Sequence, residues 1–420
     1  MGPLLRKLSV ALFPSRHGRS AFAPKVSPLD LLGRQAINLD TPELQRFIGG
    51  KRILVTGAGG SIGSEICRQI MKFCPATLVL LDRCENALFE IDQELRHRWI
   101  GTDLRPTIAD VCDARRIEQV FATERPHVVF HAAAHKHVPM MERNPGEAVK
   151  NNVFGTKTVA DAALAAGVSS FVMISTDKAV NPTSVMGATK RVAELYVQSL
   201  NRGFGHWALG LGENATHAAI ASPSKAQALR PKAQSPRFTA VRFGNVLGSS
   251  GSVVPIFQKQ IAAGGPVTVT HAEMRRYFMT IPEASQLVMQ SGAIGRGGEI
   301  FVLDMGEPVR ILDLAHEMIR RHGLVAGRDI EVKITGMRPG EKLFEELAND
   351  TDQIVSTSHK KIHVWKLPQR TPAEMEAMLG ELEAVIESSR DDVIAALMSV
   401  VPEFAPPDRS PAPPVQMAAA

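Results

Sequence analysis

The sequence contains little cysteine, little net charge and no long apolar run. Four cysteines occur in 420 residues, with no Cys-x-x-Cys pair and no spacing typical of a zinc site, so we expect reduced structural thiols. No uninterrupted apolar run approaches the roughly 18 residues of a membrane-spanning helix, so we expect no transmembrane segment. The formal net charge of +5 is small for this length and does not by itself favour nucleic acid over a small anion as the partner.

The N-terminal residues 1–25 are basic and weakly amphipathic, but their apolar stretch is too broken for a secretory signal. We therefore expect a cytoplasmic protein with a solvated N-terminal tail. Weak contact with anionic lipid at the inner face of the membrane is the alternative. The basic residues that would make this contact are Arg6, Lys7, Arg16 and Arg19.

From Lys51 onward, short β-branched runs alternate with longer amphipathic stretches, which is the pattern of parallel strands joined by crossover helices. We therefore predict an α/β fold with a Rossmann-type doubly wound parallel sheet and a smaller C-terminal substrate-binding α/β region over the carboxyl ends of the strands. The predicted strands are 52–56, 77–82, 107–109, 128–131, 171–175 and 238–242. The predicted helices are 62–73, 84–98, 114–123, 146–166, 185–202, 252–263, 282–293 and 310–322.

The length of 420 residues exceeds what one hydrophobic core usually serves and indicates more than one domain. Residues 203–236 are rich in Ala, Gly, Ser and Pro and are interpreted as a poorly ordered surface insertion. Residues 401–420 are proline-rich and are expected to be disordered. The predicted units are a tail and linker at 1–50, the sheet domain at 51–242, the smaller region at 243–400 and a tail at 401–420.

A glycine-rich turn lies between the first predicted strand and the first predicted helix. Gly57, Gly60 and Gly63 follow a Gly-x-x-Gly-x-x-Gly spacing, which allows a tight turn, close approach of backbone to a pyrophosphate and close packing of helix on strand. Asp82, which ends the second predicted strand, would accept a hydrogen bond from a ribose hydroxyl and repel a 2′-phosphate. These features predict NAD as the cofactor of the sheet domain. Because the neighbouring Arg83 could hold a 2′-phosphate, NADP is the alternative.

Further cofactor contacts are expected where the strands end. Asp110 and Val111 follow the third predicted strand and are expected at the adenine amino group, unless Asp110 is only a turn residue. The residues predicted to bind the cofactor are Gly57, Gly60, Ser61, Ile62, Gly63, Asp82, Arg83, Asp110, Val111, Ala132, Ala133 and Lys190.

Three polar residues in succession, Thr176, Asp177 and Lys178, lie at the end of the fifth predicted strand. They offer a hydroxyl to orient a substrate, a carboxyl to give a proton and an amine to take one. Lys178 can act as a base only if its pKa is lowered, which we expect from an oxidised nicotinamide and from Lys190 on the following helix. The alternative is a helix-entry turn with exposed charges.

Seven segments of the chain together resemble one enzyme family. They are ILVTGAGGSIGSE, VFHAAAHKHVPMME, NNVFGT, STDKAVNPTSVMGATK, VRFGNVLGSSGSVVP, RYFMT and RPGEKL. This set is similar to the nucleotide-sugar 4,6-dehydratases, and more narrowly to the UDP-N-acetylglucosamine 4,6-dehydratases of bacterial surface-polysaccharide biosynthesis, in the extended short-chain dehydrogenase/reductase superfamily. The resemblance covers about residues 29–365 apart from the insertion.

The resemblance implies a lyase that performs an internal redox cycle on UDP-N-acetylglucosamine. The cofactor would take hydride from C4 of the sugar, water would leave across C5 and C6, and the hydride would return to C6. The product would be a UDP-4-keto-6-deoxy-N-acetylhexosamine. On the family pattern Thr176 would hold the C4 oxygen, Asp177 would protonate the departing C6 hydroxyl and Lys178 would abstract the C5 proton. Lys190 would bind the nicotinamide ribose.

Met186 departs from the pattern of the superfamily, which places a tyrosine four residues before the lysine that is Lys190 here. A thioether has no proton to exchange, so the proton of the C4 hydroxyl would leave through Asp177, or through Thr176 and water. The substitution resembles an active, methionine-containing and usually membrane-anchored subgroup, and we expect a shortened or truncated member without the membrane part. The alternatives are a nucleotide-sugar epimerase and a catalytically silent dinucleotide-binding protein.

A UDP-sugar carries a diphosphate, which requires cationic side chains. On the family pattern Arg276 and Arg338 would hold the pyrophosphate, and Glu341 would accept a hydrogen bond from the uridine ribose. Asn245 would contact the sugar-phosphate region, and Lys136 would border the sugar. We therefore expect a UDP-sugar, and no nucleic acid, as the partner.

Three histidines near the fourth predicted strand, His131, His135 and His137, are interpreted as ordinary hydrogen-bonded residues, because the implied reaction needs no metal. Asn152 is interpreted as a structural hydrogen-bonding residue. The superfamily commonly pairs two long helices between subunits. The resemblance therefore predicts a homo-oligomer that uses the fourth and fifth predicted helices.

Overall fold

The computed structural model describes residues 41–201, 236–347, 354–365, 367 and 369–406. The predicted N-terminal tail, nearly all of the predicted insertion and most of the predicted C-terminal tail lie outside these residues. Within the described ranges, no helix has both the length and the apolar character needed to cross a membrane.

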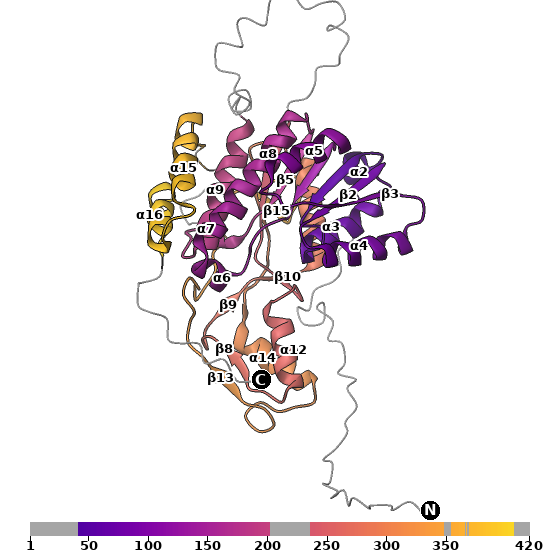
Figure 1. Cartoon of the computed structure of the whole chain (residues 1–420). Coiled ribbons are helices and arrows are strands. Elements are labelled where there is room, and N and C mark those ends of the chain that lie inside the picture. Colours follow the sequence, from indigo (N-terminus) through magenta and orange to yellow (C-terminus); the bar gives the residue numbers. More distant parts are fainter. Residues whose placement is uncertain (1–40, 202–235, 348–353, 366, 368, 407–420) are drawn as a thin grey trace, which may run out of the picture.

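Nine strands form the main sheet, and most of them are parallel (Figure 1). They are β1 (Arg52–Thr56), β2 (Thr77–Asp82), β3 (Asp103–Ile108), β4 (Val128–His131), β5 (Ser170–Ile174), β6 (Arg237–Arg242), β11 (Ile300–Leu303), β14 (Ile354–Ser356) and β15 (Ile362–Trp365). Their order is β14-β15-β11-β6-β5-β4-β1-β2-β3, and only β14 and β15 join antiparallel. The strand order reverses between β1 and β4, so the predicted Rossmann-type doubly wound sheet is confirmed.

Both faces of the sheet are covered by helices and buried. Successive side chains of a strand point to opposite faces, so each strand contributes to two cores. Ile53 and Val55 of β1 lie in one core and Leu54 lies in the other. The helices on the first face are α2 (Pro42–Ile48), α3 (Ser61–Met71), α4 (Glu85–Arg98) and α13 (Ile281–Ile294). Those on the second face are α5 (Ala114–Glu124), α8 (Thr156–Ala165), α9 (Val185–Ser199), α15 (Pro372–Val385) and α16 (Arg390–Val400).

The segment 1–50, predicted as a tail and linker, contains one of these helices. In α2, Leu44, Phe47 and Ile48 are buried in the core of the first face. Thr41 caps the helix by accepting a hydrogen bond from the backbone of Leu44 at 3.3 Å. Residues 42–48 are therefore part of the sheet domain, and the linker prediction is wrong for them.

The helix predicted at 146–166 is divided into three segments, α7 (Pro145–Ala148), a π-helix at Val149–Gly155 and α8. The wider π-helical turn occupies seven residues and is a type of irregularity that is frequent at functional sites. Asn144 precedes α7 but makes no side-chain cap to it, and its side-chain amide donates to the carbonyl oxygen of Met140 at 2.8 Å.

All residues of α9 are buried within the single chain. The sheet and α8 lie on one side of α9, and α15 and α16 pack on it from outside (Figure 1). These two C-terminal helices thus belong to the sheet domain and not to the smaller region, which corrects the predicted unit 243–400. The predicted pairing between subunits finds no exposed face on α9 in the single chain, and the homo-oligomer stays a prediction.

The chain after α16 continues to pack against the sheet domain. Val401 and Phe404 are buried, and the N–H of Ala405 donates to the carbonyl oxygen of Pro182 at 2.9 Å. The prediction of a disordered tail from residue 401 is therefore wrong for 401–406.

The smaller region has a core of its own, drawn below the main sheet in Figure 1. It contains three two-stranded pairs, β7 (Asn245–Leu247) with β10 (Phe278–Thr280), β8 (Val267–Val269) with β13 (Val332–Ile334), and β9 (Arg275–Arg276) with β12 (Val309–Arg310). Two helices, α12 (Val253–Ala262) and α14 (Ile311–Arg321), complete it. Because β7 follows almost directly from β6, this region begins at the carboxyl end of the sheet.

Candidate active site

The glycine turn between β1 and α3 is closely packed. Gly57 has a φ of +66°, and a Cβ there would lie 2.7 Å from the backbone nitrogen of Ala133. A Cβ on Gly63 would lie 2.0 Å from the carbonyl oxygen of Gly57. Gly60 precedes α3 with no side chain to cap the helix, so an anion can bind the first N–H groups. The turn therefore fits a dinucleotide pyrophosphate.

Asp82 is tied to this turn. Its Oδ2 accepts a hydrogen bond from the N–H of Gly59 at 2.9 Å, and its Oδ1 accepts one from the N–H of Cys84 at 2.9 Å. The neighbouring Arg83 has its Nη1 3.7 Å from Oδ2 of Asp110. The guanidinium that would bind a 2′-phosphate is therefore already paired with a carboxylate.

The other predicted cofactor residues lie where β1, β3 and β4 end. The N–H groups of Ala132 and Ala133 donate to the carbonyl and hydroxyl oxygens of Thr56, at 3.1 and 3.4 Å. Val111 is buried, and Ile62 is partly buried. The structure thus brings the predicted dinucleotide residues to one edge of the sheet.

The turn after β7 joins the smaller region to this edge. The hydroxyl of Ser61, at the start of α3, accepts from the N–H of Ser250 at 3.1 Å. Gly251 leaves room for the ring of His137, because a Cβ at this glycine would lie 2.6 Å from the Cε1 atom of that ring. Backbone of the smaller region therefore contacts both the glycine turn and the loop after β4.

Thr176, Asp177 and Lys178 come together beyond the end of β5. Thr176 precedes a short 3₁₀ helix (Asp177–Ala179), and its hydroxyl donates to Oδ1 of Asp177 at 2.9 Å. The amine of Lys178 donates to the same oxygen at 2.9 Å and to Oδ1 of Asn245 at 3.3 Å. The side chain of Asp177 is fully buried and that of Lys178 is 20% exposed. The alternative of a turn with exposed charges is therefore wrong.

Glu345 is a fourth member of this group that the sequence analysis missed. Its Oε1 lies 3.7 Å from Nζ of Lys178 and 3.5 Å from Nε of Arg276, and the residue is 8% exposed. Burial raises the pKa of the Glu345 carboxyl; Lys178 opposes this rise and Asp177 reinforces it. The RPGEKL segment ends two residues earlier, and no spacing distinguishes Glu345 from the adjacent Glu346.

The pKa of Lys178 differs from the expectation. Burial lowers it, but the charges of Asp177 and Glu345 outweigh burial and leave this pKa above its ordinary value. A lowered pKa occurs at Lys190 instead, where burial brings it to about 8 against the opposing charge of Glu194. The lowered pKa expected for Lys178 is therefore not found.

The start of α9 brings Met186 and Lys190 to this site. Ser184 caps the helix, and its hydroxyl accepts from the N–H of Gly187 at 3.1 Å. Met186 and Lys190 are buried one helical turn apart, and therefore on the same face.

The residues predicted to hold the substrate fall into two groups. Arg276 is buried, and its guanidinium donates to the carbonyl oxygens of Lys342 at 2.7 Å and Leu343 at 3.2 Å. Arg338 is exposed and pairs with Glu341. The structure thus shows Arg276 as a support of the segment that carries Glu345, and its contact with pyrophosphate stays a prediction.

Lys136 lies on the loop after β4 and is exposed, while His131 at the end of β4 is buried. The two ring nitrogens of His131 lie 2.8 and 3.0 Å from the hydroxyls of Thr56 and Thr156. In the part of the chain that the structure describes, no group of three or more His, Cys, Asp or Glu side chains could hold a metal ion.

Asn152 lies in the π-helix, and its side chain makes hydrogen bonds in two directions. Its Oδ1 accepts from the N–H of His135 at 2.8 Å, and its amide donates to the carbonyl oxygen of His135 at 3.0 Å and to the hydroxyl of Thr189 at 3.1 Å. It therefore fixes the loop after β4 to α9, which agrees with the structural role predicted for it.

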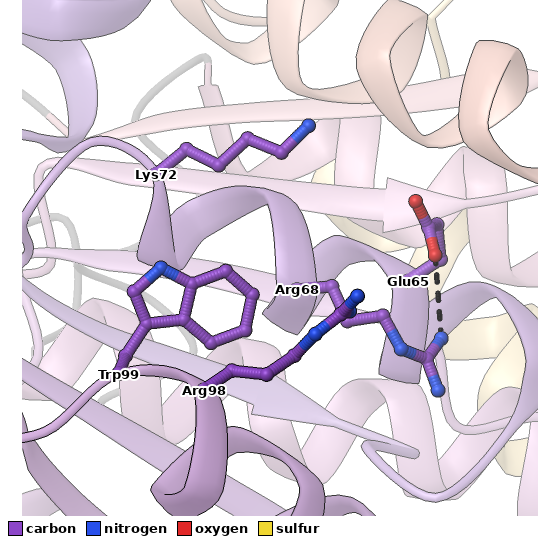
Figure 2. A pocket seen from close by; sticks show the side chains of 5 residues that line it. All are labelled: Glu65, Arg68, Lys72, Arg98 and Trp99. Carbon is purple, nitrogen blue, oxygen red and sulfur yellow. Dashed lines mark hydrogen bonds and ion pairs between the residues drawn. The ribbon is translucent and has the colours of Figure 1, made fainter.

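A separate hollow lies between the C-terminal ends of α3 and α4 (Figure 2). Two of its three cations are already engaged, because Arg68 pairs with Glu65 at 3.2 Å and Arg98 lies over the Trp99 ring. The glycine turn and the 176–178 group contribute nothing to its lining, which consists of Glu65, Arg68, Lys72, Arg98 and Trp99.

Comparison with known proteins gives three informative similarities. The chain is 50% identical over 359 residues to the capsular polysaccharide biosynthesis protein CapD of Staphylococcus aureus, which covers 85% of this chain and 55% of CapD. It is 32% identical over 308 residues to a UDP-N-acetylglucosamine 4,6-dehydratase (inverting) of Campylobacter jejuni, covering 73% and 80% of the two chains. The solved structure of Pen from Bacillus thuringiensis aligns with a TM-score of 0.64 at 31% identity, covering 78% and 92%.

This chain spans only about half the length of CapD. A family model also matches most of the chain: residues 53–367 fit the model described as "Polysaccharide biosynthesis protein". These residues include the glycine turn, the 176–178 group and Glu345. The chain therefore belongs to this polysaccharide biosynthesis protein family, as the resemblance of its motifs predicts.

Proposed function

We propose that this protein is an NAD-dependent 4,6-dehydratase of UDP-N-acetylglucosamine that acts in polysaccharide biosynthesis. The observation that carries the proposal is the hydrogen-bonded pair of Asp177 and Lys178, which is buried beside the Thr176 hydroxyl at the sheet edge that also bears the glycine turn. An acid and a base in direct contact suit the removal of water from adjacent carbons. An epimerase would need neither of them.

The residues at the glycine turn suit NAD. Gly57, Gly60 and Gly63 leave space for the pyrophosphate, and Asp82 presents a carboxylate near the expected ribose. Because Arg83 is paired with a carboxylate, a 2′-phosphate would have to compete for it. Bound there, NAD would accept a hydride from C4 of the sugar and return it to C6.

The protein residues would handle the protons. Thr176 would orient the C4 oxygen, Asp177 would give a proton to the departing C6 hydroxyl and Lys178 would take the C5 proton. A proton moving from Lys178 to Asp177 along their 2.9 Å hydrogen bond would produce the neutral amine and the carboxylic acid together. Because Met186 offers no O–H and Asp177 already holds the proton that came from Lys178, we propose that the C4 hydroxyl proton leaves through the Thr176 hydroxyl and water.

The substrate would lie between the sheet edge and the smaller region. Asn245, which contacts Lys178 at 3.3 Å, is proposed for the sugar-phosphate region and Lys136 for the border of the sugar. Arg338 and Glu341 are proposed for the diphosphate and the uridine ribose. They are paired with each other in this structure, so substrate binding would separate them.

Incubation of the purified protein with NAD and UDP-N-acetylglucosamine tests the proposal. Mass spectrometry of the nucleotide sugar should show a product that has lost one water. An isomer of unchanged mass would indicate an epimerase, and unchanged substrate would indicate a silent dinucleotide-binding protein. Either result would overturn the proposed reaction.

A further inference from the structure

Four charged side chains, three of them buried and that of Lys178 20% exposed, form one group, which we call the Asp177 cluster: Asp177, Lys178, Glu345 and Arg276. The amine of Lys178 lies between two carboxylates, at 2.9 Å from Asp177 and 3.7 Å from Glu345. Arg276 lies behind Glu345 at 3.5 Å and is itself fixed by backbone carbonyl oxygens. Glu345 therefore faces the proposed acid and base without lying on the same strand end.

The charges of the cluster balance in two different proton arrangements. With all four groups ionised, two positive and two negative charges cancel. If the Lys178 N–H bond breaks and an O–H bond forms on Asp177, the total is unchanged, because one positive and one negative charge disappear together. The pair can then become base and acid with no net charge left in a buried site.

Without Glu345, the ionised cluster would carry a surplus positive charge. Arg276 would then face Lys178 with no carboxylate between them. Repulsion of this kind favours loss of the Lys178 proton.

Glu345 differs from an ion pair in which both carboxylate oxygens accept hydrogen bonds. Among the described residues its buried Oε2 has no hydrogen-bond partner, and Oδ2 of Asp177 has none either. A carboxylate that served only packing would normally have both oxygens satisfied.

We propose that Glu345 is a positioning residue for the Asp177–Lys178 pair, whose carboxylate keeps one proton shared between these two side chains. The inference rests on the proposed function for its catalytic meaning. The placement of the proton can be measured without turnover.

The first test compares the wild type with Glu345→Gln, which keeps the size of the side chain and removes its charge. Nuclear magnetic resonance of ¹³Cε-labelled lysine, with the Lys178 signal assigned by its absence in Lys178→Met, gives the midpoint at which this amine loses its proton. The midpoint should fall by about one pH unit or more in Glu345→Gln. An unchanged midpoint would overturn the inference.

The second test uses turnover of the sugar by the same proteins. In Glu345→Gln the alkaline limb of the kcat profile should move to lower pH by a similar amount, with KM little changed. Glu345→Asp, which retains the charge, should move the limb back towards the wild-type position. A loss of activity with an unmoved limb would indicate a merely structural residue.

Glu346→Gln is the matched control, because Glu346 is adjacent and exposed and contacts Lys342 and Asn181 instead. It should leave both the Lys178 midpoint and the kcat profile unchanged. If the wild type removes no water but Glu345→Gln still shifts the Lys178 midpoint, the proposed function fails and the role of Glu345 stands. If the wild type removes water from the sugar but Glu345→Gln leaves the Lys178 midpoint unchanged, the proposed function stands and the role of Glu345 fails.

Discussion

Two groups of charged side chains lie next to the end of β5, and they differ in how many hydrogen bonds their carboxylates accept. In the first, which we call the Glu194 cluster, Glu194 accepts hydrogen bonds from the hydroxyl of Ser175 at 2.6 Å and from two nitrogens of Arg242. The second is the Asp177 cluster. Both contain an arginine and a glutamate. Ser175 of the first cluster and Asp177 of the second are only two positions apart in the sequence.

The carboxylate oxygens separate the two clusters. Both oxygens of Glu194 accept hydrogen bonds, while Asp177 and Glu345 each have one buried oxygen without a donor among the described residues. In the Glu194 cluster, the buried guanidinium nitrogens without a hydrogen bond belong to Arg191 and Arg242, whose guanidinium groups lie over a tryptophan ring. We infer that the closed cluster serves stability and that the open one is built to exchange protons.

The largest expected effect is on turnover in the open cluster. Asp177→Asn and Lys178→Met should each lower kcat about 10²–10⁴-fold, because each removes a proton-transferring group. The unfolding temperature should fall less than in a variant of the fully buried Glu194, because Lys178 keeps contact with solvent. Loss of water measured by mass spectrometry and unfolding followed by circular dichroism check both parts. Lys360→Met, at an exposed position, is the control; near-normal turnover in either site variant would contradict the comparison.

Glu194→Gln should have the opposite effect. It leaves the buried Arg242 without its counter-charge, so the free energy of unfolding should fall by about 3–5 kcal/mol. Urea unfolding measures this fall, with Glu383→Gln on the exposed side of α15 as the control. The kcat of the folded fraction should fall far less than in Asp177→Asn or Lys178→Met, because Glu194 affects the proposed site only through the charge that it presents to Lys190. Unchanged stability with impaired turnover would reverse the roles that we assign to the two clusters.

His131 is another buried polar residue with its hydrogen bonds satisfied, because its ring lies between two threonine hydroxyls. Burial lowers its pKa to about 3, and Lys190 contributes to this shift. As pH falls below about 6.5, the unfolded chain binds a proton that the folded chain rejects, so this residue should cost about 1.4 kcal/mol of stability per pH unit.

Urea unfolding between pH 6 and pH 4 would measure this loss. His131→Gln, which cannot titrate, should show an acid-side slope smaller by one proton than that of the wild type. His97→Gln, on the exposed side of α4, should not reduce the slope in the same way. An equal slope in wild type and His131→Gln would mean that His131 is charged in the folded protein.

The smallest effect should separate two neighbouring hydroxyls. Ser175→Ala removes a hydrogen bond to Glu194 and should cost about 1 kcal/mol of stability with little change in kcat. Thr176→Val removes the hydroxyl that donates to Asp177 and should lower kcat with little change in stability. Unfolding and turnover measured on both variants would show whether the adjacent residues Ser175 and Thr176 belong to different clusters.

The central strands could be predicted from sequence because parallel strands buried on both faces are short apolar runs. β3 was predicted at 107–109 but spans Asp103–Ile108; it is an edge strand with mostly exposed residues and a proline, so its first half lacks an apolar signal. The helix α15 was also missed, although Thr371, Pro372 and Glu374 form a capping box that a sequence can reveal.

The site was predictable where its residues are neighbours in sequence. Thr176, Asp177 and Lys178 are consecutive, and the residue types alone indicate acid–base chemistry. Glu345 reaches Lys178 only because Arg276 fixes the backbone of residues 342–343 beside the sheet edge. A contact between segments so far apart along the chain follows from the tertiary fold, and so does the raised pKa of Lys178.

The enclosure of α9 by α15 and α16 has a consequence for biosynthesis. Ribosomes make proteins from the N-terminus, so the helix that carries Met186 and Lys190 emerges well before the two helices that cover it. Until they arrive, its apolar flank is open to misassociation. A stop codon placed before Pro372 should therefore yield an aggregating product, even though the residues of the proposed catalytic group would all have been translated.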